Sequence, residues 1–492
     1  MRRILFFTIL GLVMLGSCTK FDDQLYDSIN ENQYPENELQ LAIIPSPAYE
    51  PMREFVDGGG WWFAQELTSD EMVCPTRHTD WDDGGKWAVL HTHEWTNANE
   101  SINNMWSRFL NGVRNSNKAI ETLEQYLPSE SAAIGISKLK ILRGYYYYLL
   151  IDNYGKAPYV TKFKDAEDKP SNSSRTAIFD SITTEISKEL QNIPEDQVSK
   201  YSVTRGMAYS LLAKLYLNAE VYTGTPQWAI AEKYCDSVMM LGYSLEGDAL
   251  APFVTQNETS PENIWTIPFD EERFTGFNLH MRTLHYNHNL TFDMTVGPWN
   301  GFAVMEAHFN TYADNDSRKR GFLYGPQYDM AGKPIIDAAA GNKPLVLTPN
   351  IPALIMGAEY SPEQIRMSGV RVAKFEIKKG AKENLSNDFP IFRYADILLM
   401  KAESRIRQGL NGDQWVNDVR QRAGLDPWSN TTLDQLLEER GREMFWEAHR
   451  RQDLIRFGKF NDAWWEKDQS TPDRKVFPIP QWAIDENPNL AN

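Results

Sequence analysis

The chain has 492 residues, a formal net charge of −17 and an aromatic content of 12%, with 15 Trp. This length accommodates a large core or two domains, and no Pro-, Gly- or Ser-rich linker divides the chain, so we expect one compact unit. The acidic balance, without a basic patch interleaved with aromatic residues, argues against binding to nucleic acid.

The N-terminal segment has the parts of a secretory signal. Arg2 and Arg3 precede an apolar run over residues 4–15, which is shorter than the roughly 20 residues that span a bilayer. The run ends in Leu-Gly-Ser-Cys18 and resembles a bacterial lipoprotein signal, in which Cys18 is acylated as the lipid anchor and becomes the first mature residue. An ordinary signal peptide with an incidental cysteine is the alternative. We expect residues 1–17 to be the signal peptide and the polar residues 18–37 to be a flexible tether.

Apolar residues recur every three or four positions in five segments between residues 97 and 242, which predicts five helices. These apolar stripes cover residues 97–127, 139–154, 178–190, 208–219 and 226–241. We expect Gly155 to end the second helix, Ser174 or Thr176 to cap the third, and Thr225-Pro226 to begin the fifth. The fourth and fifth resemble a divergent tetratricopeptide helix pair, with generic helical hairpins as the alternative.

Residues 243–390 lack this regularity and are rich in Gly, Pro, Asn and aromatic residues, with strand-like pieces at 264–267 and 370–377. We interpret them as an irregular elaboration on a helical frame, where binding surfaces are usually built. Helices are predicted again at 392–408, 414–423 and 431–449. In the last, we expect ion pairs along one helix face, which brace the structure rather than form a catalytic cluster: Glu439–Arg442, Glu447–Arg450 and Glu447–Arg451.

The loop over residues 68–95 is the favoured ligand surface. Trp81 lies in it among polar and Gly residues and is flanked by charged side chains, namely Arg77, Asp80, Asp82 and Asp83. An aromatic ring stacks on the apolar face of a sugar while charged groups bond its hydroxyls. Tyr286 and Trp299 are similar candidates. The alternative is that the tryptophans fasten a long loop to the scaffold, and four of them are expected in the core: Trp61, Trp62, Trp95 and Trp106.

His91 and His93, with Glu94 beside them, raise the possibility of a metal site, but no third His or Cys follows at a recognisable spacing. The chain also has no Gly-rich phosphate loop, nucleophile elbow or zinc-protease motif. We therefore expect no catalytic residue, metal or cofactor. Cys74 and Cys235 could pair or could remain small buried apolar groups.

Six segments, taken together, resemble the SusD/RagB family of outer-membrane glycan-binding lipoproteins of Bacteroidetes. They cover residues 153–159 (NYGKAPY), 204–217, 228–231, 392–403 (FRYADILLMKAE), 439–456 and 477–490. The resemblance implies a mainly α fold: a tetratricopeptide-like helical-repeat scaffold with an irregular, loop-rich insertion that carries short strands. We expect a single domain over residues 38–492, with its scaffold at 38–242 and 391–492 and the elaboration at 243–390.

The function implied by this resemblance is non-enzymatic capture of oligo- or polysaccharide and its delivery to a SusC-like TonB-dependent transporter. The acidic pair Asp22-Asp23 looks like the surface-export signal of such lipoproteins, which places the protein on the outer membrane facing the exterior. Two alternatives remain. A surface glycoside hydrolase would need two carboxylates across a cleft, and a structural cap on the transporter would make no glycan contact.

Overall fold

The computed structural model describes residues 38–195 and 199–491. The predicted signal peptide, Cys18 and the tether at 18–37 lie outside the described residues. The chain divides into two units, Met1–Ile43 and Ile44–Asn492, and the described part of the first is helix α2 (Glu38–Ile43). The predicted partition of residues 38–492 into scaffold and elaboration remains a proposal.

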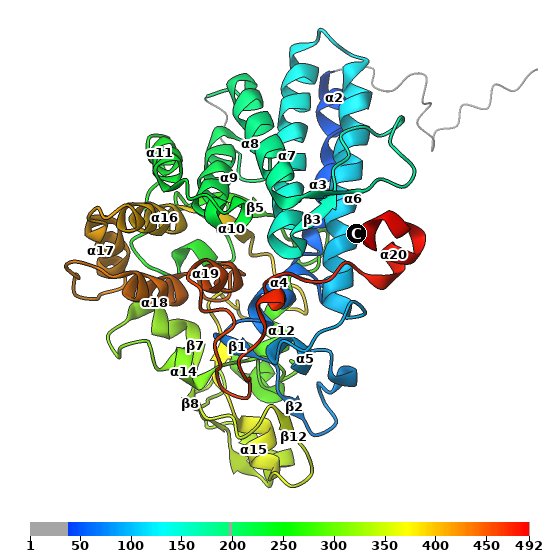
Figure 1. Cartoon of the computed structure of the whole chain (residues 1–492). Helices are drawn as coiled ribbons and strands as arrows, with labels where there is room; N and C mark the ends of the chain where they lie inside the picture. The colour runs from blue at the N-terminus through cyan, green and yellow to red at the C-terminus, as the bar shows by residue number, and fades with distance from the viewer. Residues whose placement is uncertain (1–37, 196–198, 492) are drawn as a thin grey trace, which may run out of the picture. The chain divides into compact units, whose positions relative to one another are not determined.

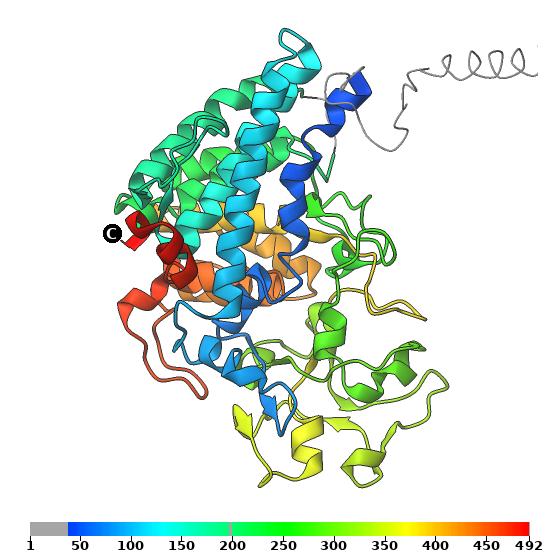
Figure 2. The same cartoon turned by 90° about the vertical axis from the view of Figure 1, so that its right-hand side faces the viewer.

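Helices dominate the first part of the second unit (Figures 1 and 2). They are α3 (Ser46–Arg53), α4 (Trp61–Leu67), α5 (Ala88–His91), α6 (Glu100–Glu124), α7 (Glu130–Tyr154), α8 (Arg175–Glu189), α9 (Arg205–Leu217), α10 (Ala219–Thr223) and α11 (Trp228–Met239). The long helices α6 and α7 pack against each other, α8 packs on α7, and α9 pairs with α11.

Local signals explain where these helices begin and end. The Asn99 side chain accepts hydrogen bonds from two backbone amides at the start of α6, and Ser174 caps α8 in the same way, as one of the two predicted alternatives. Gly155 ends α7 in the left-handed conformation, with φ 73°, as predicted. The predicted start of α11 at Thr225-Pro226 is wrong, because the helix begins at Trp228.

Helix α7 is the centre of the helical part. Its consecutive residues Tyr145, Tyr146, Tyr147 and Tyr148 are all buried, as expected for a helix that packs on every side. Their hydroxyl groups need partners there: Tyr146 donates to the Ala48 carbonyl at 2.6 Å and Tyr147 to the Val160 carbonyl at 2.8 Å. Within the described ranges, no helix combines the length and the apolar character needed to cross a membrane.

The strands are short, and the described residues pair them two by two. The pairs are β1 (Met72–Val73) with β6 (Ala303–Val304), β2 (Thr76–Arg77) with β12 (Ile355–Met356), β3 (Lys156–Pro158) with β4 (Asn172–Ser174), β5 (Asn263–Ile267) with β14 (Phe389–Arg393), β7 (Phe322–Leu323) with β13 (Arg371–Val372), β8 (Gly325–Pro326) with β11 (Val346–Leu347), and β9 (Ile336–Asp337) with β10 (Lys343–Pro344). The β2–β12 pair is parallel and the others are antiparallel.

Short helices accompany these strands and a second helical group follows them. The short ones are α12 (Leu279–Thr283), α13 (Asn289–Phe292), α14 (Glu306–Phe309) and α15 (Pro362–Met367). The later ones are α16 (Tyr394–Arg407), α17 (Asp413–Arg422), α18 (Leu433–Met444), α19 (Arg450–Arg456) and α20 (Gln481–Glu486). Helix α16 packs on α11, α17 and α18 around an apolar cluster that includes Leu399, Val416 and Leu436.

The predicted helix over residues 431–449 is wrong beyond Met444, where α18 ends. Trp446 and Ala448 have left-handed φ values of 68° and 64°, and the chain enters α19 only at Arg450. The predicted pairs of Glu447 with Arg450 and with Arg451 are therefore wrong, because Glu447 pairs with Lys374 and Arg393 instead. The Glu439–Arg442 pair is confirmed, with an N–O distance of 2.8 Å.

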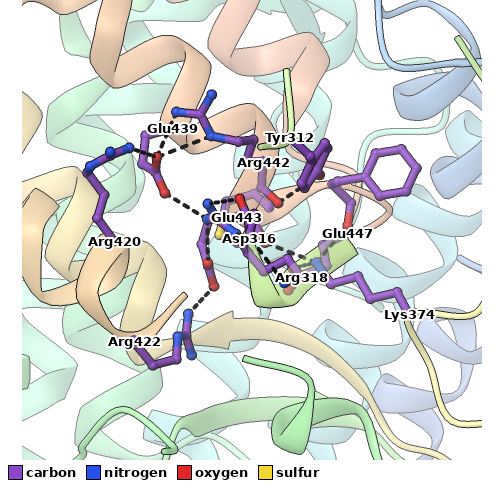
Figure 3. A network of polar contacts seen from close by, with 12 residues as sticks. Tyr312, Asp316, Arg318, Lys374, Arg420, Arg422, Glu439, Arg442, Glu443 and Glu447 are labelled. Carbon is purple, nitrogen blue, oxygen red and sulfur yellow. Dashed lines mark hydrogen bonds and ion pairs between the residues drawn. The ribbon is translucent and has the colours of Figure 1, made fainter. Parts of the chain in front are cut away.

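A buried ion network surrounds α18 and the turn after it (Figure 3). The Glu443 carboxylate contacts Arg393 at 2.6 Å and Arg318 at 3.1 Å, and Arg422 is also paired with it. Glu447 contacts Arg393 and Lys374, each at 2.6 Å. These cations hold the pKa of Glu443 well below its usual range against the opposing effect of burial. The network fastens the irregular segment over residues 243–390, called the short-strand region from here on, to the C-terminal helices.

We predict that Arg393→Met lowers the free energy of unfolding by about 3–5 kcal/mol, because it leaves buried carboxylates without a partner. Arg320→Met is the matched control: this arginine pairs with Asp248 at the surface, where an ion pair contributes about 0–1 kcal/mol. Denaturant unfolding of both variants measures the difference. Equal stability of the two variants would contradict a structural role for the network.

Burial also determines how stability depends on pH. Seven of the eight histidines are buried, and loss of hydration lowers the pKa of each. The values are about 4 for His91, His280 and His285, about 3 for His288, His308 and His449, and about 2 for His93. Three buried acids act in the opposite direction, since burial raises the pKa of Glu71 well above its usual range, that of Glu66 to about 8 and that of Asp388 to about 6.

We predict that the protein loses stability as the pH falls below about 6.5, where the unfolded chain binds protons that the folded histidines do not accept. Each net proton contributes up to about 1.4 kcal/mol per pH unit. Urea unfolding at several pH values measures the slope. His308→Gln should reduce it by about one proton, whereas replacement of the exposed His78 by Gln should leave it unchanged. A flat profile in this window would contradict the prediction.

Candidate functional site

The loop after β2 reverses the chain and presents Trp81. The Arg77 amide donates to the Asp80 carbonyl at 2.8 Å, and the Asp80 amide donates back to the Arg77 carbonyl at 3.1 Å. His78 and Trp81 both have left-handed φ values, 63° and 61°, which side chains other than Gly rarely adopt. Such strain persists only where the surroundings enforce it, and it clusters at functional sites.

Arg77 anchors this loop to other segments through its buried side chain. Its side chain is 2% exposed and makes five hydrogen bonds, as many as a guanidinium has N–H groups. The acceptors are the carbonyls of Gly301, Ile365 and Ser368 and the Ser368 hydroxyl. No donor of Arg77 is left for a ligand, so the structure argues against its predicted contact with sugar hydroxyls. Its role is to position the loop.

Trp81 is half-buried and fixed in place. Its indole N–H donates to the Trp299 carbonyl at 2.7 Å, and its ring packs on Phe302 with 5.2 Å between centroids. Gly301 lies directly against this ring: a Cβ at that position would come within 2.3 Å of Trp81. The absence of a side chain at Gly301 is therefore needed for this segment to approach the loop that carries Trp81.

The other two predicted aromatic residues, Tyr286 and Trp299, lie beside the loop that carries Trp81. Trp299 is half-buried, with the Arg282 guanidinium 5.2 Å from its ring centroid. The Tyr286 hydroxyl donates to the Asp80 carboxylate, next to Trp81. We call Trp81, Tyr286 and Trp299 the aromatic platform. Residues that are more than 200 positions apart in the chain thus form one partly exposed surface.

Arg366 supports this platform, although no sequence pattern predicted this role. Its guanidinium lies 4.5 Å from the Tyr286 ring centroid and makes two hydrogen bonds, of 2.6 and 2.9 Å, to Asp337. Asp337 also lies 3.3 Å from Nε2 of buried His285. The pairing with Arg366 and His285 holds the pKa of the Asp337 carboxyl below its usual range. No local motif marks Arg366, because its partners come from distant segments.

The three predicted aspartates differ in their surroundings, although all are exposed. Asp80 accepts the Tyr286 hydroxyl, and Asp83 accepts a hydrogen bond from the Trp87 indole at 2.7 Å. The Asp82 carboxylate makes no hydrogen bond to the described residues. Asp80 and Asp83 therefore orient aromatic rings, while Asp82 is free to bond a ligand. Contact of these aspartates with a ligand stays a prediction.

The four tryptophans expected in the core are buried, namely Trp61, Trp62, Trp95 and Trp106. The two histidines considered for a metal are occupied by the protein itself. His91 Nε2 donates to the Trp465 carbonyl at 2.8 Å, and His93 Nε2 donates to the Thr68 carbonyl at 3.1 Å. Within the described ranges, no three His, Cys, Asp or Glu side chains are placed to hold a metal ion. Cys74 and Cys235 are both free and buried.

Comparison with known proteins gives matches along most of the chain. Residues 261–492 match a family model described as SusD family, and residues 62–217 match one described as starch-binding associating with outer membrane. The starch-binding protein SusD of Bacteroides thetaiotaomicron is 24% identical over 475 residues, covering 87% of this chain and 83% of the relative. SusD-like protein P25 of Formosa agariphila is 24% identical over 422 residues, covering 79% and 78%.

Solved structures with the same fold are also found. Surface glycan-binding protein A from Bacteroides thetaiotaomicron, in complex with laminarihexaose, superimposes with a TM-score of 0.73 at 22% identity and covers 92% of this chain and 97% of its own. A SusD superfamily protein from Parabacteroides distasonis gives a TM-score of 0.75 at 17% identity, covering 94% and 99%. These matches confirm the expected fold, mainly helical and SusD-like.

We predict that Gly301→Ala displaces the Trp81 ring, because the added methyl group would overlap it. The expected result is a changed near-ultraviolet circular dichroism signal and a red-shifted tryptophan emission, with the helical signal retained. Gly297→Ala is the control in the same segment, since a Cβ there would meet only the Tyr286 carbonyl at 3.8 Å. Identical spectra for the two variants would show that Gly301 does not constrain Trp81.

Proposed function

Because this chain belongs to the SusD family, we propose that it captures oligo- or polysaccharide at the cell surface and does not cleave it. The observation that carries this proposal is the aromatic platform. Three half-buried rings, each held by a hydrogen bond or a guanidinium, offer apolar faces at one partly exposed surface. Fixed rings lose little conformational entropy when a sugar stacks on them, which favours binding.

The charges around the platform fit a neutral saccharide. The Asp82 carboxylate is available to accept hydrogen bonds from hydroxyl groups. The net charge of −17 disfavours a polyanionic ligand. Arg282 and Arg366, which lie beside the rings, are paired with Asp57 and Asp337 respectively.

The carboxylates beside the platform support binding over hydrolysis. A glycoside hydrolase needs one carboxyl group to give a proton and another to attack or to activate water. Asp80 and Asp83 are each engaged by an aromatic N–H or O–H group that they orient. Glu66, with its pKa raised to about 8, is buried and bonded to the Ala448 amide, away from solvent. An assay for reducing ends released from polysaccharide by the pure protein tests this part of the proposal. We expect no release, and turnover would contradict the proposal.

We further propose that Cys18 anchors the mature protein by acyl chains to the outer membrane, facing the exterior, where it delivers saccharide to a SusC-like TonB-dependent transporter. The description of one matching family as associating with the outer membrane supports this location. Two acyl chains suffice for stable anchoring, since each buried methylene contributes about 0.8 kcal/mol. The sugar bound by the relatives, starch or laminarin according to their names, suggests where a ligand search should start.

We predict that Trp81→Ala and Trp299→Ala each weaken saccharide binding about tenfold, through loss of a stacking face. Affinity electrophoresis in gels that contain single polysaccharides, starch and laminarin among them, measures this effect. Trp482→Ala is the matched control, because Trp482 lies on α20 with 41% of its surface exposed. Wild-type protein that no polysaccharide retards, or equal retardation of all four proteins, would favour the structural cap without glycan contact.

A further inference from the structure

A cavity of about 290 Å³ lies between α14, the segment before β12 and the loop after α19. This volume is close to the lower end for ligand pockets in proteins, about 300 Å³. Three segments that are far apart in sequence line it: residues 305–310, residues 350–351 and Trp465. None of these lining residues belongs to the aromatic platform.

The lining of the cavity separates into an apolar floor and a polar rim. Met305 and Ile351 are buried, and the Trp465 ring lies half-exposed beside them. Glu306, Asn310 and Asn350 are exposed around the opening. An apolar floor with a few convergent polar groups is the usual composition of a small-molecule site.

The polar groups of the rim are available for a ligand. The Asn350 amide reaches the Glu306 carboxylate only at 3.5 Å, the outer limit for a hydrogen bond. The Asn310 side chain makes no hydrogen bond to the described residues. Among the residues that the structure describes, no Lys, Arg or His lines the cavity, so these residues offer no positive charge to balance a phosphate or a carboxylate. A neutral ligand with hydroxyl groups fits both the donors and the acceptors.

Trp465 is held in a fixed position for contact with such a ligand. Trp464 and Lys467 exchange backbone hydrogen bonds of 3.1 and 3.0 Å, which close a tight turn around it. His91 Nε2 donates to the Trp465 carbonyl at 2.8 Å, and the two rings lie 5.7 Å apart. A ring that is ordered before binding costs less entropy to use.

We propose that this cavity is a second saccharide site, in which a sugar unit stacks on Trp465 and bonds to Asn310, Asn350 and Glu306. The inference rests on the proposed function and extends it. Strand β6 connects the two sites: Trp299 and Gly301 precede it, and Met305 and Glu306 follow it. Gly301 and Met305 are four residues apart, which is about 13 Å of extended chain. A polysaccharide with repeating units can occupy both sites at once.

Affinity electrophoresis of full-length mature protein, in the polysaccharide gel that retards the wild type most, tests the second site. Trp465→Ala and Asn310→Ala should each weaken retention about three- to tenfold. The double variant Trp81→Ala/Trp465→Ala should lose the retention that Trp81→Ala alone keeps. Asn310 is exposed, so its replacement keeps the test valid even if Trp465→Ala fails to fold. Trp482→Ala should match the wild type.

Calorimetric titration with a two-unit fragment of whichever glycan binds gives an independent readout, because a fragment this short does not bridge the two sites. Two sites predict about two ligands per wild-type chain and about one for Trp465→Ala. Retention and stoichiometry equal to the wild type in both Trp465→Ala and Asn310→Ala, with Trp81→Ala still defective, would overturn the second site alone. Wild-type protein that binds no glycan would overturn the proposed function and this inference together.

Discussion

The buried ion network around α18 is the interaction on which the arrangement of the site depends. Glu443 lies at the end of α18 and Glu447 in the turn after it. Burial without charged partners would favour the neutral, protonated form of both carboxyl groups. The cations that neutralise them come from other segments: Arg318 and Lys374 from the short-strand region and Arg393 from β14. Each ion pair therefore joins two parts of the chain. Because a buried ion must find its own partner, the network favours one docking of these parts over other dockings of similar hydrophobicity.

This docking places the platform. Tyr286 and Trp299 belong to the short-strand region, whereas Trp81 follows β2. Arg77 bridges the two by donating to Gly301 and Ser368, and the indole of Trp81 donates to Trp299. Loops carry Trp81 and Trp299, and a single-turn 3-10 helix (Tyr286–His288) carries Tyr286, but every ring has a partner from another segment. The surface is thus ordered although it has little regular secondary structure, which is the condition for weak stacking contacts to yield net affinity.

The helical scaffold could be predicted from the sequence because its signals are local. Apolar spacing, the cap at Ser174 and the left-handed Gly155 lie within the helices that they define. The break after Met444 could not be predicted: Trp446 and Ala448 carry no sign of a left-handed conformation, and Arg393 and Lys374, which hold Glu447, are 54 and 73 positions away. Trp81, in contrast, could be identified as a candidate from the sequence, because its Gly-rich polar context is a local signal. The inward direction of Arg77 and the place of Arg366 depend on distant carbonyls and on Asp337, and no sequence pattern encodes them.

Two modest aromatic sites are well suited to a polymer with repeating units. Once one unit of a chain stacks on the platform, the next units are confined near the protein, and binding at the cavity becomes an intramolecular step at high effective concentration. The benefit requires that the two sites keep a fixed separation. Strand β6 fulfils this requirement because it is paired with β1 and bonded through Val304 to Val370, so it behaves as a short rigid spacer. Two weak contacts on a rigid spacer discriminate against monosaccharides, which gain nothing from the second site, and release a long chain only when both contacts are open at the same time.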